Sequence, residues 1–236
     1  MRLTRNDKLI SSRSKISRYT TFAGLATLFG SLVISFNNTS LIALAYGLLA
    51  LGFVLAYIGA TFANKYIREP RADNALDKAL KGFDNKNHLY SWILPVEQAM
   101  LTPTGIIVFR VKPQDGKVTC KNDKWSRPLG IGSLFGGMGQ EPLANPATDL
   151  RNDIDAMKKW LADKIENAAL VPVDGYAIFS DPKVNLTIED SSVPALRADD
   201  LKDTLRKSKR GAVLPPALYD SIQKAMDAEA NGKTAE

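Results

Sequence analysis

The chain has 236 residues, 45% of them hydrophobic, and carries a formal net charge of +6 at pH 7. The positive charge flanks one apolar segment: the residues before position 19 contribute +5, residues 65–71 contribute +2, and the chain from residue 72 onward carries −1. The net charge therefore does not indicate a basic nucleic-acid-binding domain, and the single cysteine, Cys120, excludes an intrachain disulfide.

Residues 19–64 contain no Asp, Glu, Lys, Arg or His. The segment is too long for one helix of a soluble core, and the turn formers at residues 37–40 divide it into two apolar stretches. Each stretch approaches the roughly 20 residues that a helix needs to cross a bilayer. We therefore predict two membrane-spanning helices, Tyr19–Phe36 and Leu41–Ala63, that form an antiparallel hairpin.

Two other interpretations fit parts of this segment. A cleaved signal peptide fits the basic start, but a second apolar stretch follows directly and no convincing small-residue cleavage site is present. A soluble apolar hairpin is the other alternative. In the membrane interpretation, small residues allow the two helices to approach closely, and the candidates are Gly24, Gly30, Gly47, Ala50 and Gly52.

The basic flanks predict the orientation of the hairpin. Lys and Arg are abundant at both of its ends and absent from the connecting loop, so the positive-inside rule places both ends in the cytoplasm. We expect a multi-pass protein of the cell (inner) membrane, with the lipid bilayer as a partner. The predicted divisions are a basic cytoplasmic tail (1–18), the hairpin (19–64), a cytoplasmic domain (70–210) and a C-terminal helix and tail (211–236).

The polar part of the chain predicts an α/β (α+β) domain. A helix is expected at 73–83, because Ala75, Leu76, Ala79 and Leu80 share one face. β-forming residues and intervening turns then predict an antiparallel meander of strands at 88–94, 97–102, 105–112 and 117–121. Residues 125–144 are rich in glycine and lack periodicity, so they predict a long loop.

The remaining elements follow that loop. Asn145 and Pro146 form a helix-start signal, with Asn as the cap and Pro at the first helical position. The helix is expected to continue to Asn167. Strands at 170–180, interrupted near Asp174-Gly175, and at 184–188 come next, followed by helices at 199–207 and 215–230 and a frayed tail.

The order of these elements and several short motifs resemble the nuclease-related domain (NERD) family over about residues 73–206. The matching motifs are His88-Leu89-Tyr90, Leu101–Val108 with its Pro-x-Gly turn, Lys112 followed by Gly116, Trp125 followed by Asn145-Pro146, and Val173–Ser180. The resemblance implies a restriction-endonuclease-like fold with an αβββαβ core and a mixed sheet.

The resemblance also implies where an active site would lie. In active nucleases of this fold, an Asp on the second strand and a Glu-x-Lys on the third bind Mg²⁺ and position the attacking water. The Asp position falls here on Glu97 and the Lys position on Lys112, whereas Arg110 replaces the expected Glu. Asp149 stands where a Gln often follows the Asn-Pro motif.

Strand geometry predicts what replaces the metal. Arg110 and Lys112 share a face of their strand, and a two-residue turn at Pro103-Thr104 sets Glu97 opposite Arg110. We therefore predict a Glu97–Arg110 ion pair in place of the metal and no nuclease activity. A solvated strand face carrying these three charged side chains is the alternative.

Three functions stay open at this point. The first is a non-catalytic, membrane-anchored module without a cofactor that binds a protein or nucleic acid at the cytoplasmic face. The second is an active Mg²⁺-dependent DNA nuclease that uses Glu97 and a migrated ligand from Asp115, Glu141 or Asp149. The third is a membrane scaffold without a ligand site. The only histidine, His88, is expected to be a strand residue and not a ligand.

Overall fold

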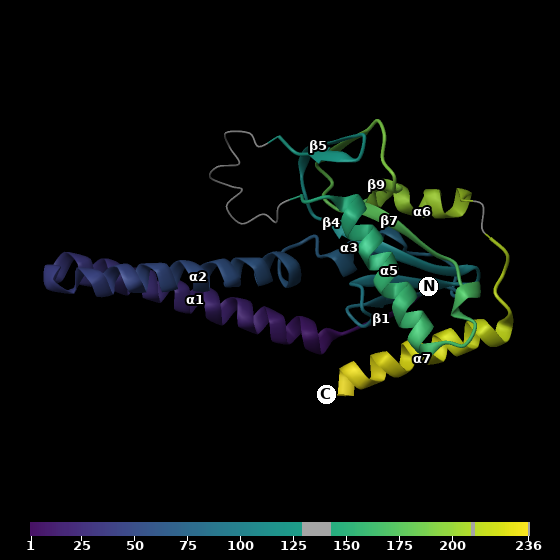
Figure 1. Cartoon of the computed structure of the whole chain (residues 1–236), viewed down its shortest axis with the longest axis horizontal. Helices are drawn as coiled ribbons and strands as arrows, with labels where there is room; N and C mark the ends of the chain where they lie inside the picture. Colours follow the sequence, from purple (N-terminus) through teal and green to yellow (C-terminus); the bar gives the residue numbers. More distant parts are fainter. Residues whose placement is uncertain (129–142, 209–210, 236) are drawn as a thin grey trace. The chain divides into compact units, whose positions relative to one another are not determined.

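The computed structural model describes residues 1–128, 143–208 and 211–235, in two units (Figure 1). One unit, termed the hairpin, is Lys8–Glu69. The other, termed the α/β domain, combines Met1–Asp7 with the described chain from Pro70 onward. The hairpin is thus inserted in the sequence of the α/β domain.

The hairpin consists of two long apolar helices. Helix α1 (Asp7–Asn37) and helix α2 (Ile42–Tyr66) are joined through a 3₁₀ turn, Thr39–Leu41. Their most apolar windows have mean hydropathies of 1.5 and 2.1, and only 11% and 17% of those windows is buried inside the structure. The helices are therefore long and apolar enough to cross a membrane. Helix α1 begins earlier than predicted and includes four basic residues that precede Tyr19, namely Lys8, Arg13, Lys15 and Arg18.

The two hairpin helices pack along positions seven residues apart, and most of the residues there are small. The buried positions are Ile10, Ser17, Gly24 and Ser31 on α1 and Ala45, Gly52, Gly59 and Tyr66 on α2. A strict seven-residue period is typical of a left-handed coiled coil. A Cβ added to Gly24 would lie 2.7 Å from the Ala56 amide nitrogen, so the backbones approach closely there. The hydroxyls of Ser17 and Ser31 donate hydrogen bonds across this interface to the Gly59 and Ala45 carbonyls, at 2.7 and 2.6 Å.

The contact residues predicted from sequence were only partly right. Gly24 and Gly52 lie at the interface, as expected. Gly30 and Gly47 have no neighbour within 4 Å of an added Cβ, and Ala50 is exposed. Small size alone does not place a residue at the interface, because the seven-residue period decides which side chains face the partner helix.

The α/β domain is built on a mixed six-stranded sheet of order β1-β2-β3-β4-β7-β9. Strands β2, β3 and β4 form an antiparallel meander, and the pairs β1–β2, β4–β7 and β7–β9 are parallel. The strands are β1 (Arg2–Arg5), β2 (His88–Ser91), β3 (Gln98–Thr102), β4 (Gly105–Lys112), β7 (Val173–Phe179) and β9 (Ala195–Arg197).

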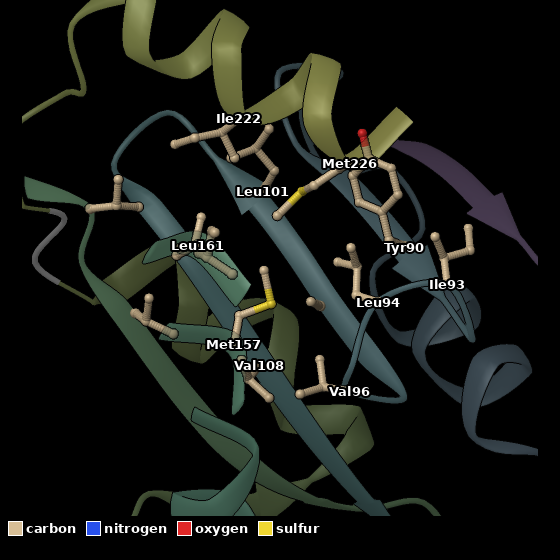
Figure 2. Close-up of a cluster of buried hydrophobic side chains, with 14 of the residues drawn as sticks. Tyr90, Ile93, Leu94, Val96, Leu101, Val108, Met157, Leu161, Ile222 and Met226 are labelled. Carbon is tan, nitrogen blue, oxygen red and sulfur yellow. The ribbon is translucent and has the colours of Figure 1, made fainter. Parts of the chain in front are cut away.

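Helices cover both faces of this sheet because its side chains alternate between two apolar clusters. On one face, α5 (Pro146–Lys164) and α7 (Pro216–Ala235) pack on Leu101 and Val108 (Figure 2). On the other face, α3 (Ala72–Ala79) and α6 (Ala198–Lys207) pack on Met100 and Phe109. The buried core therefore lies on both sides of β3 and β4.

The last strand of the predicted meander is not in this sheet. Strand β5 (Gly116–Lys121) forms a second, three-stranded sheet of order β6-β5-β8 with β6 (Lys124–Ser126) and β8 (Val184–Ile188). Gly116 has a φ of +72°, which redirects the chain after β4. Val118, Phe179 and Val184 form a separate apolar cluster there, which stabilises the departure from the main sheet.

Several predicted boundaries also differ from the structure. Strand β7 is not broken at Gly175, where the missing side chain accommodates Leu150 of α5: an added Cβ would lie 2.7 Å from Leu150 Cδ1. The strand predicted at 88–94 ends at Ser91, and a 3₁₀ turn (Ala168–Leu170) precedes β7. Helix α7 extends to Ala235 where a frayed tail was expected. The long loop predicted at 125–144 falls mostly outside the described residues.

The largest difference concerns the first residues of the chain. Residues 1–18 were predicted to be a tail, but Arg2–Arg5 forms the edge strand β1, which pairs in parallel with β2. The ladder is extended at both ends by hydrogen bonds from the Arg2 amide to the Asn87 carbonyl (3.0 Å) and from the Asn6 amide to the Ser91 carbonyl (3.1 Å). The α/β domain therefore begins before the hairpin and resumes after it.

Candidate functional site

Five charged side chains gather around the positions at which the resemblance predicts an active site. Strand β4 directs Arg110 and Lys112 to the same face as Ile106 and Val108, which pack under α5. Helix α5 contributes Asp149 and Asp153, which lie four residues apart and therefore face the same side of the helix. Glu97, directly before β3, is the fifth. These five side chains, Glu97, Arg110, Lys112, Asp149 and Asp153, are termed the charged cluster.

Arg110 lies between two carboxylates. Its Nη2 donates a 2.6 Å hydrogen bond to Asp153 Oδ1, and its Nη1 lies 3.6 Å from Glu97 Oε1. The second contact follows from the register, because the β3–β4 ladder that pairs residue 99 with 108 sets Glu97 opposite Arg110. The two-residue turn at Pro103-Thr104 and the Glu97–Arg110 ion pair are thus both present as predicted. The shorter contact, to Asp153, was not foreseen.

Lys112 forms the second ion pair of the charged cluster. Its Nζ lies 2.6 Å from Asp149 Oδ2, and only 6% of its side chain is exposed. Asp149 occupies the first turn of α5, where the helix dipole favours a negative charge. The turn itself begins as the sequence indicates: the Asn145 side chain accepts hydrogen bonds from the Ala147 and Thr148 amides, and Pro146 follows the cap.

The electrostatics of the charged cluster depend on Arg110. Burial raises the pKa of Asp153, the charge and hydrogen bond of Arg110 oppose that rise, and the neighbouring Glu97 and Asp149 carboxylates add to it. The net effect is a raised pKa for Asp153. Three carboxylates therefore share one region with two cations, and Arg110 compensates the carboxylate that is least exposed.

A short buried loop fixes Glu97. The Trp92 amide donates to the Glu97 carbonyl at 2.8 Å and closes the segment between β2 and β3. Trp92 has a φ of 63°, a left-handed conformation that is rare for a large side chain and costs on the order of 1–3 kcal/mol. Burial of Trp92 and Ile93 stabilises this conformation. The sequence predicted a strand at 88–94 in place of this loop, because the aromatic and β-branched residues of the loop also favour strands.

The proposed alternative metal ligands are engaged elsewhere or not described. Asp115 is bound by Arg127, Asp149 is bound by Lys112, and Glu141 lies outside the described residues. Across residues 1–128, 143–208 and 211–235, no three His, Cys, Asp or Glu side chains are arranged to hold a metal ion. Sequence reasoning missed Asp153, although its spacing of four residues from Asp149 on one helix was a usable signal.

His88 belongs to a separate hydrogen-bonded chain. The Tyr90 hydroxyl donates to Asp227 Oδ1 at 2.7 Å and lies 3.0 Å from His88 Nδ1, while His88 Nε2 lies 2.7 Å from the Thr4 hydroxyl. Because the single Tyr90 hydroxyl hydrogen goes to Asp227, His88 Nδ1 must donate its N–H to Tyr90. Burial lowers the pKa of His88, Asp227 opposes that shift, and Arg2 adds to it. The histidine is thus a β2 residue linking β1 to α7.

Comparisons with family models, curated proteins and solved structures find no match for this chain.

Proposed function

We propose that this chain is a membrane-anchored, non-catalytic interaction module with a degenerate nuclease-like fold, similar to the NERD family. The observation that carries the proposal is Arg110, which lies between Glu97 and Asp153. The element order supports the resemblance: α3, the meander β2-β3-β4, α5 and β7 occur in the order helix, three strands, helix and strand, with β5 and β6 of the second sheet between β4 and α5.

The chemistry of Arg110 argues against metal-dependent cleavage at this position. A guanidinium stays protonated at any physiological pH and has no lone pair available for a metal. It also repels a divalent cation at the very place where two carboxylates converge. Lys112, which would stabilise charge on a scissile phosphate, is instead buried against Asp149. The charged cluster therefore joins α5 to β4 through two ion pairs.

The chain path supports membrane anchoring by two crossings. Strand β1 precedes the hairpin and pairs with β2, which follows it. Both ends of the hairpin therefore connect to one folded domain and must leave a bilayer on the same side, as two crossings require. The basic flanks place that side in the cytoplasm by the positive-inside rule. The charge of −1 from residue 72 onward favours a protein partner over duplex DNA.

One substitution tests the assignment directly. Arg110→Glu restores the Glu-x-Lys pattern beside Glu97 and Asp153 and supplies a third carboxylate for a hard cation. We expect the variant, as full chain in nanodiscs, to bind Mn²⁺ at least about tenfold more tightly than the wild type, a gain of ~1.4 kcal/mol. Electron paramagnetic resonance of free Mn²⁺ measures it. Arg110→Gln, which removes the cation without adding a ligand, is the matched control.

The competing function gives the opposite result. If the wild-type chain is a nuclease, it will cleave single- or double-stranded DNA with Mg²⁺ or Mn²⁺, and Glu97→Gln will abolish cleavage. That outcome would refute the non-catalytic assignment. Wild-type protein that leaves both substrates intact, together with metal binding gained only by Arg110→Glu, supports it.

A further inference from the structure

A groove at one edge of the α/β domain is unrelated to the charged cluster. It lies between the start of strands β1 and β2 and the first turns of α7, and its volume is about 470 Å³. That volume falls within the range of small-molecule sites, roughly 300–1,000 Å³. The lining residues that matter here are Arg2, Lys86, His88, Leu214 and Tyr219.

The walls of this groove are held by hydrogen bonds between distant segments. The Leu214 amide donates to the Pro103 carbonyl at 2.8 Å, and the Tyr219 hydroxyl donates to the Lys86 carbonyl at 2.9 Å. These bonds hold the segment before α7 and the first turns of α7 against the residues that follow β3 and precede β2. The groove is therefore preformed, which reduces the entropy lost when a ligand binds.

Part of the groove lining is apolar. Pro103, Leu214, Pro216 and the Tyr219 ring line it, and Val213 at its rim is 72% exposed. A large apolar side chain left in water beside a concave apolar wall favours contact with a hydrophobic group. The His88 ring also lines the groove. It offers the ligand a ring face and no free nitrogen, because both of its nitrogens are already hydrogen-bonded to Thr4 and Tyr90.

Two cations also line the groove. Within the described residues, the side chains of Arg2 and Lys86 make no hydrogen bond or ion pair, although both line the groove. Asp220 is the one acidic residue among the lining residues, so the groove keeps an excess positive charge. The charge of Arg2 also lowers the pKa of His88 and opposes the burial-driven rise in the pKa of Tyr219, which places the guanidinium near the groove wall.

We propose that this groove binds a small amphipathic anion, whose apolar body packs on Leu214 and Tyr219 while its phosphate or carboxylate contacts Arg2 and Lys86. A guanidinium recognises both head groups with paired hydrogen bonds, and a nearby ammonium adds a point charge. The head group can belong to a soluble metabolite or to an anionic lipid, and both share this chemistry.

The test uses the full chain in phosphatidylcholine nanodiscs and the probe 1-naphthyl phosphate. Isothermal titration calorimetry should detect binding that inorganic phosphate alone does not reproduce. Arg2→Gln should weaken binding about tenfold or more, because a charge-assisted contact is lost, and Lys86→Gln should weaken it in the same direction. Lys224→Gln, which removes an exposed cation of α7 outside the groove, should leave it unchanged.

Two further measurements make the test decisive. Urea unfolding followed by tryptophan fluorescence checks that Arg2→Gln still folds. Repeating the titration with phosphatidylglycerol in the nanodiscs identifies the source: binding lost there points to a lipid head group, and binding retained points to a soluble anion. Absence of 1-naphthyl phosphate binding at millimolar concentration, or equal affinity in Arg2→Gln and wild type, would overturn the proposal.

Discussion

Asp73, near the start of α3, is the residue whose removal we expect to destabilise the α/β domain most clearly. Its side chain is fully buried and accepts hydrogen bonds from Arg71 Nε (2.6 Å), Arg71 Nη2 (2.9 Å) and Arg5 Nη1 (3.1 Å). Arg5 ends β1 just before the hairpin, and Arg71 directly precedes α3 just after it. One carboxylate therefore binds the two segments of the domain that flank the hairpin.

The expected magnitude follows from burial. Removing one partner of a buried ion pair typically costs about 3–5 kcal/mol. The Arg5 and Arg71 side chains remain 31% and 15% exposed, so water recovers part of that loss. Arg5 also keeps a 2.6 Å contact with Asp7. We therefore expect Asp73→Ala to lower the free energy of unfolding by about 2–3 kcal/mol.

The assay is urea unfolding of the full chain in detergent micelles, followed by tryptophan fluorescence. All three tryptophans, Trp92, Trp125 and Trp160, lie in the α/β domain, so the signal reports on this unit and not on the hairpin. Asp77→Ala, an exposed aspartate on the same helix, is the matched control and should change stability by no more than about 0.5 kcal/mol. Equal effects of the two substitutions would refute the reasoning.

The pH dependence gives an independent check. Burial raises the pKa of Asp73, but the hydrogen bonds and charges of Arg71 and Arg5 outweigh it, and the net pKa is lowered. A carboxyl with a lowered folded-state pKa stabilises the fold above its unfolded-state pKa, about 4, and loses that contribution as the pH falls through the folded-state value. The stability difference between wild type and Asp73→Ala should therefore be full at pH 7 and shrink below about pH 4.

Two further predictions concern the hairpin and His88. Gly24→Leu should lower the SDS concentration at which the hairpin unfolds, measured by circular dichroism, because an added Cβ would lie 2.7 Å from a backbone nitrogen of α2. Gly30→Leu, with no neighbour within 4 Å of its Cβ, should behave as wild type, and equal loss in both would contradict the seven-residue interface. His88, with its lowered pKa, stabilises the fold above about pH 6.5 and loses that contribution as the pH falls. His88→Gln should flatten the loss of stability below about pH 6.5 in the urea assay, and an unchanged profile would exclude His88 as its source.

Local signals predicted the central elements well. Strand β4 and strand β8 have the boundaries expected from sequence, and Asn145 caps α5 as its residue type indicates. The two-residue turn before Gly105 fixed the β3–β4 register, and the register in turn placed Glu97 beside Arg110. These predictions succeeded because each depends on residues that are close in sequence, where turn geometry and side-chain alternation leave few alternatives.

Pairings between distant segments were not predicted. Strand β5 joins β8 across more than 60 residues, and the Arg110–Asp153 contact joins β4 to a helix residue 43 positions later in the sequence. Neither partner is encoded locally, since the sequence of β5 is compatible with either sheet. Lys112 and Asp149 were each identified as site residues, but their ion pair depends on how α5 packs on β4. Packing of that kind is a property of the folded domain and not of a motif.

The position of β1 gives the hairpin a role in folding. Joining β1 to β2 through an unstructured segment of the same length would cost about 3–4 kcal/mol of loop-closure entropy. The hairpin avoids most of this cost, because its antiparallel helices bring their own ends together: the Ser14 hydroxyl near one end donates to the Tyr66 carbonyl at the other, at 3.3 Å. Arg2–Arg5, which has a single apolar side chain, can therefore form an edge strand although its own sequence carries almost no strand signal.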